Sequence, residues 1–273
     1  MTALSPVVLS ILAFFAGLLI GSFLNVCIFR LPRDLSVVAP RSFCPECETQ
    51  IRAWDNIPVL SYLLLRGRCR QCSVKIPWSY PIVELATGLA FAAAVYMLGL
   101  TADALKMCIF WAILIDLIAT DLEERILPDE FTLGGTVVGL IMAAFVRLEF
   151  GPAAMFLYNK LAPRWLSVIE SAVAAAFPCF VIWFVGWLYE KIRHREGLGL
   201  GDVKMIAMIG AFLGLRDALL TLVVASVVGA VGGVIYVLWT KKEMGSYELP
   251  FGSFLGVAAL VVSAAETVAR FHR

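Results

Sequence analysis

Two aspartates stand where the sequence passes from polar to strongly apolar, and they are the first candidates for chemistry. Asp202 follows the glycine-rich stretch 197–201 and precedes an apolar run that ends at Leu215. Glycines allow a sharp turn. The run is shorter than the roughly 20 residues that a helix needs to cross a bilayer, so Asp202 is expected in or beside low-dielectric surroundings. An ionisable residue at such a depth is a functional candidate that needs a partner.

Asp121 is the candidate partner, because both aspartates are expected at the same membrane face. Asp121 ends the apolar segment 102–120, and the apolar segments 131–148 and 168–189 bring the chain back to that side before Asp202. Two close carboxyls cannot both ionise easily, so one keeps a proton and the other acts as a base. The pair predicts aspartyl peptide hydrolysis. The alternatives are a solvated helix end for Asp121 and a helix N-cap for Asp202.

Other charged residues near this pair receive simpler interpretations. Asp116 is five residues before Asp121 and cannot share its helix face neatly, so we expect a buried hydrogen-bonding partner. Asp129 follows a proline and is expected to be the N-cap of the next helix. Lys204 is expected to pair with a nearby carboxylate or a lipid headgroup. A solvated acidic rim is the interpretation for Glu123, Glu124 and Glu130.

Four cysteines in one polar insertion, residues 30–79, form two Cys-x-x-Cys pairs separated by 21 residues. They are Cys44, Cys47, Cys69 and Cys72. Four thiolates at this spacing are typical of a structural zinc site, and such a site is closed, so the ion would hold the loop together rather than perform chemistry. The alternative is free or redox-active cysteines. Packing inside apolar segments is the expected role of Cys27, Cys108 and Cys179.

The composition indicates the class of protein that must position these residues. Hydrophobic residues make up 61% of the chain and charged residues 16%, against about 45–50% and about 25% in soluble domains. We therefore expect an all-α, polytopic membrane protein that contacts the lipid bilayer. The net charge of +1 gives no reason to expect nucleic acid as a partner. The first apolar run lacks a basic leading region and a cleavage site, so it is expected to be a retained helix.

About eight apolar segments follow one another along the chain, at 7–29, 80–99, 102–120, 131–148, 168–189, 201–215, 217–240 and 251–267. The connections that contain most of the 22 lysines and arginines all fall on one side, which the positive-inside rule makes cytoplasmic. This orientation places the N-terminus outside, and the two aspartates and the four-cysteine insertion on the cytoplasmic side.

At this point the residues resemble a known family. Gly-Leu-Gly-Asp at 199–202 is similar to the Gly-x-Gly-Asp signature of intramembrane aspartyl proteases, and nearly the whole chain resembles the bacterial type IV prepilin leader peptidase/N-methyltransferase family. The resemblance rests on the two cysteine pairs and on these stretches: Gly21-Ser22-Phe23-Leu24-Asn25-Val26, Arg30-Leu31-Pro32, Asp55-Asn56-Ile57-Pro58, Arg66-Gly67-Arg68-Cys69-Arg70, Tyr80-Pro81-Ile82-Val83-Glu84, Asp121 to Asp129, Gly201-Asp202-Val203-Lys204 and Pro250-Phe251-Gly252.

The resemblance implies that Asp121 and Asp202 are the catalytic pair. They would remove short basic leaders from prepilins and pseudopilins of type IV pili and type II secretion, at the cytoplasmic face of the bacterial inner membrane. It further implies that residues 1–100 methylate the new N-terminus with S-adenosylmethionine, and that residues 101–273 form the peptidase part. Where many members have Asp-x-Asp, this chain has Asp121-Leu122-Glu123. The candidate methyl-donor residues are Asn25, Arg30, Asn56 and Glu84, for which helix packing and loop ordering are the alternative.

Two rival functions belong to other classes. An ion-coupled transporter would use intramembrane carboxylates to carry protons, but no inverted repeat of broken helices is evident in the sequence. A zinc-anchored scaffold without catalysis would leave Asp202 and its glycines without a purpose. The sequence does not indicate an oligomeric state.

Overall fold

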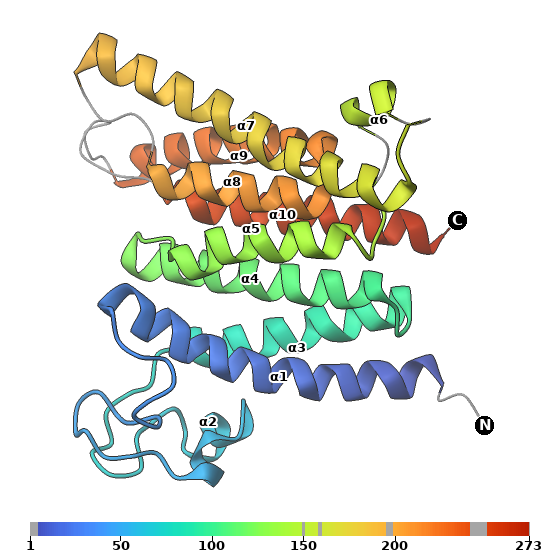
Figure 1. Cartoon of the computed structure of the whole chain (residues 1–273). Helices are drawn as coiled ribbons and strands as arrows, with labels where there is room; N and C mark the ends of the chain where they lie inside the picture. Colours follow the sequence, from blue (N-terminus) through green and yellow to red (C-terminus); the bar gives the residue numbers. More distant parts are fainter. Residues whose placement is uncertain (1–4, 149–150, 158–159, 195–198, 241–249, 273) are drawn as a thin grey trace. The chain divides into compact units, whose positions relative to one another are not determined.

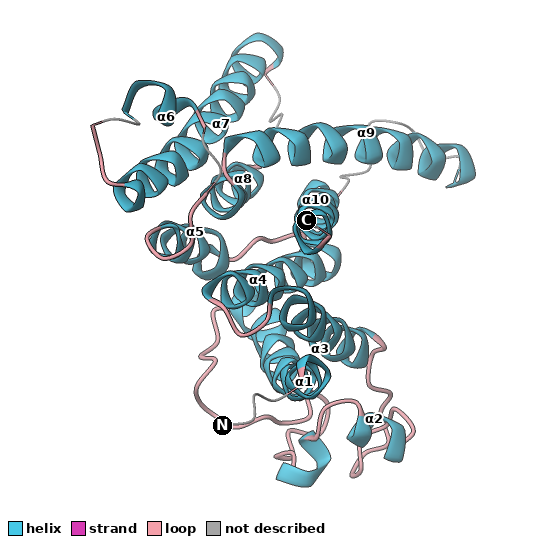
Figure 2. Cartoon of the chain, turned by 90° about the vertical axis from the view of Figure 1, so that its right-hand side faces the viewer, coloured by secondary structure: helices cyan, strands magenta, loops and turns pink. Residues whose placement is uncertain are grey.

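The computed structural model describes residues 5–148, 151–157, 160–194, 199–240 and 250–272 (Figure 1). These residues form α-helices joined by turns and short 3-10 helices, and β-structure among them is limited to two isolated bridges, Phe43 with Gln50 and Arg68 with Lys75 (Figure 2). The expected all-α class is therefore confirmed for the described residues. The chain divides into two compact units, Met1–Thr120 and Asp121–Arg273, which are described separately below.

Each apolar segment expected from the sequence overlaps one helix. These helices are α1 (Pro6–Arg30), α3 (Ser79–Leu98), α4 (Ala102–Glu124), α5 (Asp129–Ala143), α7 (Pro163–Arg193), α8 (Leu200–Leu213), α9 (Leu215–Thr240) and α10 (Phe251–Phe271). Among the described residues, five helices, namely α1, α3, α7, α9 and α10, are long and apolar enough to cross a membrane. The chain is thus a multi-pass membrane protein, and eight crossings stay a prediction. The short elements are η1 (Leu31–Arg33), η2 (Ala53–Asn56), α2 (Leu60–Leu64) and α6 (Pro152–Leu157).

In the first unit, α1 and α3 run antiparallel and pack at close range through glycines. A Cβ atom added at Gly17 would lie 2.7 Å from the carbonyl oxygen of Thr87, and one added at Gly21 would lie 2.7 Å from Cα of Glu84. Glycines one helical turn apart allow this close approach, as is common between membrane helices. The contact places Asn25, one turn after Gly21, beside the first turns of α3.

The second unit is organised around α8. This helix contacts α5, α7, α9 and α10 (Figure 2), and nine of its residues are buried, namely Val203, Met205, Ile206 and positions 208–213. A helix that is apolar on all sides is stable when neighbours surround it. Gly210 makes the closest contact, because a Cβ there would lie 2.0 Å from the carbonyl oxygen of Ala174 on α7.

Candidate active site and metal site

Asp121 lies near the C-terminal end of α4, and its carboxylate is held by the first turn of α10. The side chain is buried, with a relative exposure of 6%. Its Oδ2 atom accepts one hydrogen bond from the backbone N–H of Ser253 and one from the Ser253 hydroxyl, both at 2.6 Å. The first N–H groups of a helix have no acceptor within the helix, and Asp121 supplies one here. The solvated helix end considered for Asp121 is therefore wrong.

Asp202 is half-buried in the first turn of α8. The N-cap of this helix is Gly199, three residues earlier, so the N-cap role considered for Asp202 is wrong. Gly201, next to Asp202, and Gly252, which lies against the carboxyl group of Asp121, both pack on Leu127, so the structure brings the two predicted catalytic residues together. Of the glycine-rich stretch, Gly197 and Leu198 lie outside the described residues.

Leu127 explains why the two aspartates approach each other. A Cβ atom at Gly201 would lie 3.2 Å from Cβ of Leu127, and a Cβ atom at Gly252 would lie 2.9 Å from Cδ1 of Leu127 and 3.2 Å from Cγ of Asp121. The glycines that directly precede Asp202 and Ser253 therefore both pack against Leu127. Only Gly201 of the described glycines before Asp202 serves this packing. Gly199 has a φ of −67° and Gly201 lies within α8, so neither makes the sharp turn expected from the sequence.

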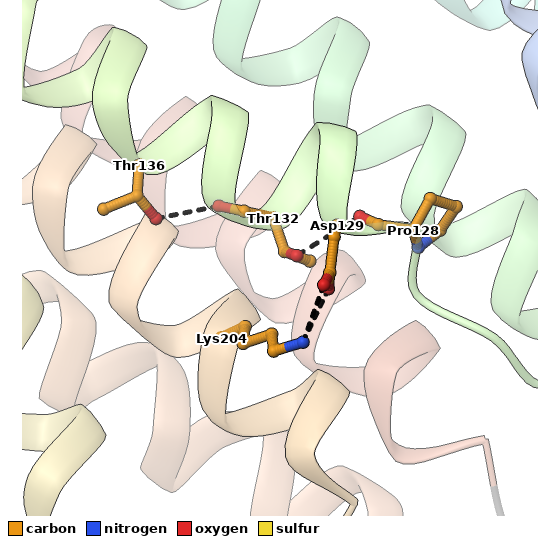
Figure 3. Close-up of polar contacts among 5 residues, drawn as sticks. All are labelled: Pro128, Asp129, Thr132, Thr136 and Lys204. Atoms are coloured by element: carbon orange, nitrogen blue, oxygen red, sulfur yellow. Dashed lines mark hydrogen bonds and ion pairs between the residues drawn. The ribbon is translucent and has the colours of Figure 1, made fainter. Parts of the chain in front are cut away.

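An ion pair fastens the beginning of α5 to the beginning of α8 (Figure 3). The Nζ atom of Lys204 lies 2.7 Å and 2.9 Å from the two carboxylate oxygens of Asp129, which confirms the expected carboxylate partner of Lys204. The N-cap role of Asp129 is wrong: α5 begins at Asp129 itself, its N-cap is Pro128, and the carboxylate turns to Lys204 instead. Both side chains are partly exposed, and such pairs contribute at most about 1 kcal/mol.

The remaining acidic residues take roles close to those expected. Asp116 is fully buried, and its Oδ2 atom accepts a long hydrogen bond of 3.5 Å from the hydroxyl of Thr120. The other oxygen of Asp116 has no partner among the described residues. Glu123 and Glu130 are exposed, while Glu124 is half-buried.

The four predicted metal ligands come together in the first unit. Their Sγ atoms all lie within 4.8 Å of one another, and those of Cys44 and Cys72 are 3.8 Å apart. A tetrahedral zinc ion with Zn–S bonds of about 2.3 Å separates its sulfur ligands by about 3.8 Å. The four thiols therefore fit a metal ion, with one thiol pair supplied by each Cys-x-x-Cys turn.

The two turns share one backbone pattern. In the first, the N–H of Cys44 donates to the carbonyl of Thr49, and the N–H of Glu48 donates to the carbonyl of Cys44. The second repeats both bonds between the equivalent residues, Cys69 with Val74 and Ser73 with Cys69. Glu48 and Ser73 both have a positive φ, of 52° and 60°. Each turn is thus a separately formed knuckle that presents two sulfurs.

The thiolate is the form of cysteine that binds a metal, and the surroundings favour it at Cys47 and Cys69 but not at Cys72, where burial and the neighbouring cysteine side chains raise the pKa to about 12. The hydroxyl and then the backbone of Thr49 lower the pKa of Cys47 to about 6. Backbone groups of Cys72 and Gln71 lower the pKa of Cys69. A redox-active pair needs only two sulfurs, whereas here four converge within 4.8 Å of one another, so the geometry favours a metal ion.

Two of the four candidate methyl-donor residues, Arg30 and Glu84, hold the loop between α1 and α3, and a third, Asn25, joins α1 to the first turn of α3. Arg30 is buried and donates to the carbonyls of Ser36 and Pro40, each at 2.8 Å. Asn25 donates to the carbonyl of Tyr80 at 3.0 Å. The buried carboxylate of Glu84 accepts the N–H of Val59 at 2.7 Å, whereas Asn56 is exposed at the end of η2.

A further ion pair in this loop was not anticipated. Arg70 donates to both carboxylate oxygens of Asp55, at 2.8 Å and 2.6 Å, and its hydrogen bond lowers the pKa of Asp55. The pair ties η2 to the second cysteine knuckle. Both residues fall within stretches that the resemblance quotes, but nothing in their spacing indicates that they meet.

Two family models match separate parts of the chain. The N-terminal domain of bacterial A24 peptidases matches residues 15–98, and the type IV leader peptidase family matches residues 108–234. A prepilin leader peptidase/N-methyltransferase of Stutzerimonas stutzeri is 34% identical, over 95% of this chain and 91% of the relative. The chain belongs to the type IV leader peptidase family. A prepilin leader peptidase/N-methyltransferase of Pseudomonas aeruginosa is 33% identical over 90% of this chain and 86% of the relative.

A third relative carries a different name. It is the type 4 prepilin-like proteins leader peptide-processing enzyme of Escherichia coli, which is 35% identical over 95% of this chain and 96% of the relative. No solved structure matches. The two family models meet near residue 100, whereas the compact units divide at Thr120 within α4. A functional division at residue 100 stays a prediction.

Proposed function

We propose that this protein removes the short basic leader from type IV prepilins and pseudopilins and then methylates the new N-terminal residue. The observation that carries the peptidase part is the packing around Leu127, where the first turn of α8, which contains Asp202, meets the first turn of α10, which holds the carboxylate of Asp121. The family models and the names of the relatives support a peptidase and a methyltransferase activity.

Peptide hydrolysis by the pair needs no group beyond the chain and water. One carboxylate acts as general base and activates a water molecule, while the other, protonated, polarises the scissile carbonyl. Both acids are wholly or partly removed from solvent, where charge development is governed by fixed neighbours rather than by water. The positive-inside argument places this chemistry at the cytoplasmic face of the bacterial inner membrane.

The first unit would support methyl transfer. A structural zinc ion bound by Cys44, Cys47, Cys69 and Cys72 would hold the loop, and its binding would contribute to folding rather than to bond cleavage. S-adenosylmethionine would supply the methyl group. Glu84 offers a buried carboxylate, the type of group that suits a cationic donor, while Arg30, Asn25 and Asn56 would order the loop around it.

The test is cleavage of a leader-bearing prepilin by the purified full-length protein, followed by mass spectrometry. We expect Asp121→Asn and Asp202→Asn each to abolish cleavage, because asparagine keeps the shape of the side chain but neither titrates nor accepts the proton of water. The matched control is Asp116→Asn, a fully buried aspartate of the same α4 helix, which should keep appreciable activity. An active Asp121→Asn together with an inactive Asp116→Asn would identify a different pair.

A further inference from the structure

We propose that Ser253 is a positioning residue for peptide hydrolysis: it occupies Oδ2 of Asp121, so that Oδ1 of Asp121 is the base and Asp202 supplies the acid. This inference rests on the proposed function and deepens it, because it gives the two aspartates different roles. Nothing in the family motifs distinguishes them.

The geometry around Asp121 leaves one oxygen for catalysis. Oδ2 accepts the backbone N–H and the hydroxyl of Ser253, both at 2.6 Å. Hydrogen bonds from a hydroxyl to an ionised carboxylate fall at about 2.5–2.7 Å, and an oxygen that already accepts two short bonds is not the one that holds a proton. Oδ1 is therefore the oxygen of Asp121 that can receive a proton from water.

The two aspartates are not equivalent. The N–H of Ser253 is one of the first N–H groups of α10, a helix of 21 residues, and the partial positive charge at a helix N-terminus favours an anion. Among the described residues, the carboxylate of Asp202 receives no side-chain or backbone hydrogen bond. A proton shared by the pair is thus better placed on Asp202 than on Asp121.

The reaction balances with these roles. Oδ1 of Asp121 takes a proton from water as the water oxygen bonds to the scissile carbonyl carbon, and Asp202 gives its proton to the carbonyl oxygen. The C–N bond of the tetrahedral intermediate then breaks, Asp121 gives its proton to the leaving nitrogen, and Asp202 takes one back as the carbonyl re-forms. One water is consumed, and an acid and an amine are released.

The decisive variants are Ser253→Ala, Ser253→Thr and the control Ser263→Ala. Ser263 is a buried serine on the same helix whose hydroxyl donates to two carbonyls of α10, those of Ala259 at 2.6 Å and Leu260 at 3.2 Å. We expect Ser253→Ala to lower kcat for cleavage by about 10- to 100-fold, the usual effect of losing one hydrogen bond to a charged group. KM should stay within about twofold, because the role proposed for Ser253 acts through Asp121 rather than through substrate binding.

The conservative variant separates positioning from packing. Ser253→Thr keeps the hydroxyl and should restore kcat to within about threefold of the original protein, and Ser263→Ala should cleave normally. Methylation of a pilin that has already been cleaved serves as the folding check, because the candidate residues for that activity lie in the other unit. Ser253→Cys, a weaker donor in a similar volume, should fall between Ala and Thr and tests the proposal even when Ser253→Ala fails this check.

Four results would overturn the proposal: a normal kcat in Ser253→Ala, a loss confined to KM, an equal loss in Ser263→Ala, or no recovery in Ser253→Thr. A starting protein that cleaves no prepilin overturns the proposed function and this inference together. A starting protein that cleaves, with a Ser253→Ala variant that cleaves equally well, overturns the inference alone.

Discussion

Leu127 contacts Gly252, beside Asp121, and Gly201, beside Asp202, through different atoms, so truncating Leu127 should relieve crowding at the two glycines to different extents. We consider Gly252→Ala and Gly201→Ala, each alone and combined with Leu127→Ala. At Gly252 the new Cβ would meet Cδ1 and Cδ2 of Leu127 at 2.9 Å and 3.1 Å, and Leu127→Ala removes both atoms. At Gly201 the nearest atom is Cβ of Leu127 at 3.2 Å, which alanine retains.

The expected magnitudes follow from these contacts. Forcing an extra methyl into a packed site costs about 1–3 kcal/mol, offset by up to about 1 kcal/mol of helix propensity when glycine becomes alanine. The propensity gain is similar at both glycines and so cancels when the two are compared. We expect Leu127→Ala to recover at least about 1 kcal/mol of the loss caused by Gly252→Ala, and distinctly less of the loss caused by Gly201→Ala.

The assay is a pair of double-mutant cycles. Initial rates of leader cleavage and thermal unfolding in detergent would be measured for the starting protein, the three single variants and the two double variants. A recovery of about 1.4 kcal/mol corresponds to tenfold in rate. The glycine control is Gly134→Ala, because a Cβ at Gly134 would meet nothing within 4 Å, and it should show no coupling to Leu127. Equal recovery for Gly201 and Gly252, or none for either, would refute the packing described around Leu127.

Two further predictions concern the loop and the acidic rim. Replacing Cys44 and Cys72 with serine should remove the bound metal and disorder the loop, so that methylation fails first while cleavage survives in part. Elemental analysis would measure the bound metal, and mass spectrometry of the processed pilin would measure cleavage and methylation. A metal-free variant that methylates at the normal rate would contradict this prediction. Neutralising Glu123, Glu124 and Glu130 should raise KM for a prepilin with a basic leader at low salt and have a smaller effect at high salt. The reason is that the attraction between the acidic rim and the leader is screened beyond about 8 Å at physiological ionic strength. A KM that changes neither with these charges nor with salt would exclude this attraction.

The sequence predicted which of these side chains meet in space, while their chemical roles stay predictions. The parity of the apolar segments placed Asp121 and Asp202 at one face, and packing on Leu127 brings them together within the second unit. The paired Cys-x-x-Cys spacing predicted four sulfurs at one point, and the Sγ atoms converge as expected. Both predictions rest on rules that depend only on spacing along the chain.

The sequence did not predict the residues that act through tertiary contact. Ser253 directly follows the Pro250-Phe251-Gly252 stretch, but it has no charge and no pairing pattern, and its partner Asp121 is 132 residues away. Leu127 is one apolar residue among many, and its position between the two aspartates is evident only from its contacts with Gly201 and Gly252. The Asp129 prediction failed because Lys204 on another helix offers its carboxylate a stronger partner than the N-terminus of α5.

The bond between Asp121 and Ser253 also has a consequence for biogenesis. α10 follows all the other described helices in the chain, so Ser253 is synthesised 132 residues after the aspartate that it holds. At about 5–20 residues per second, translation of that interval takes roughly 7–26 s. Throughout that time the emerging chain already contains α4, and later α8 with Asp202, but the oxygen of Asp121 has no fixed donor. With the role proposed for Ser253, the protease would mature only when α10 enters the bilayer, so nascent chains would be spared premature proteolytic activity.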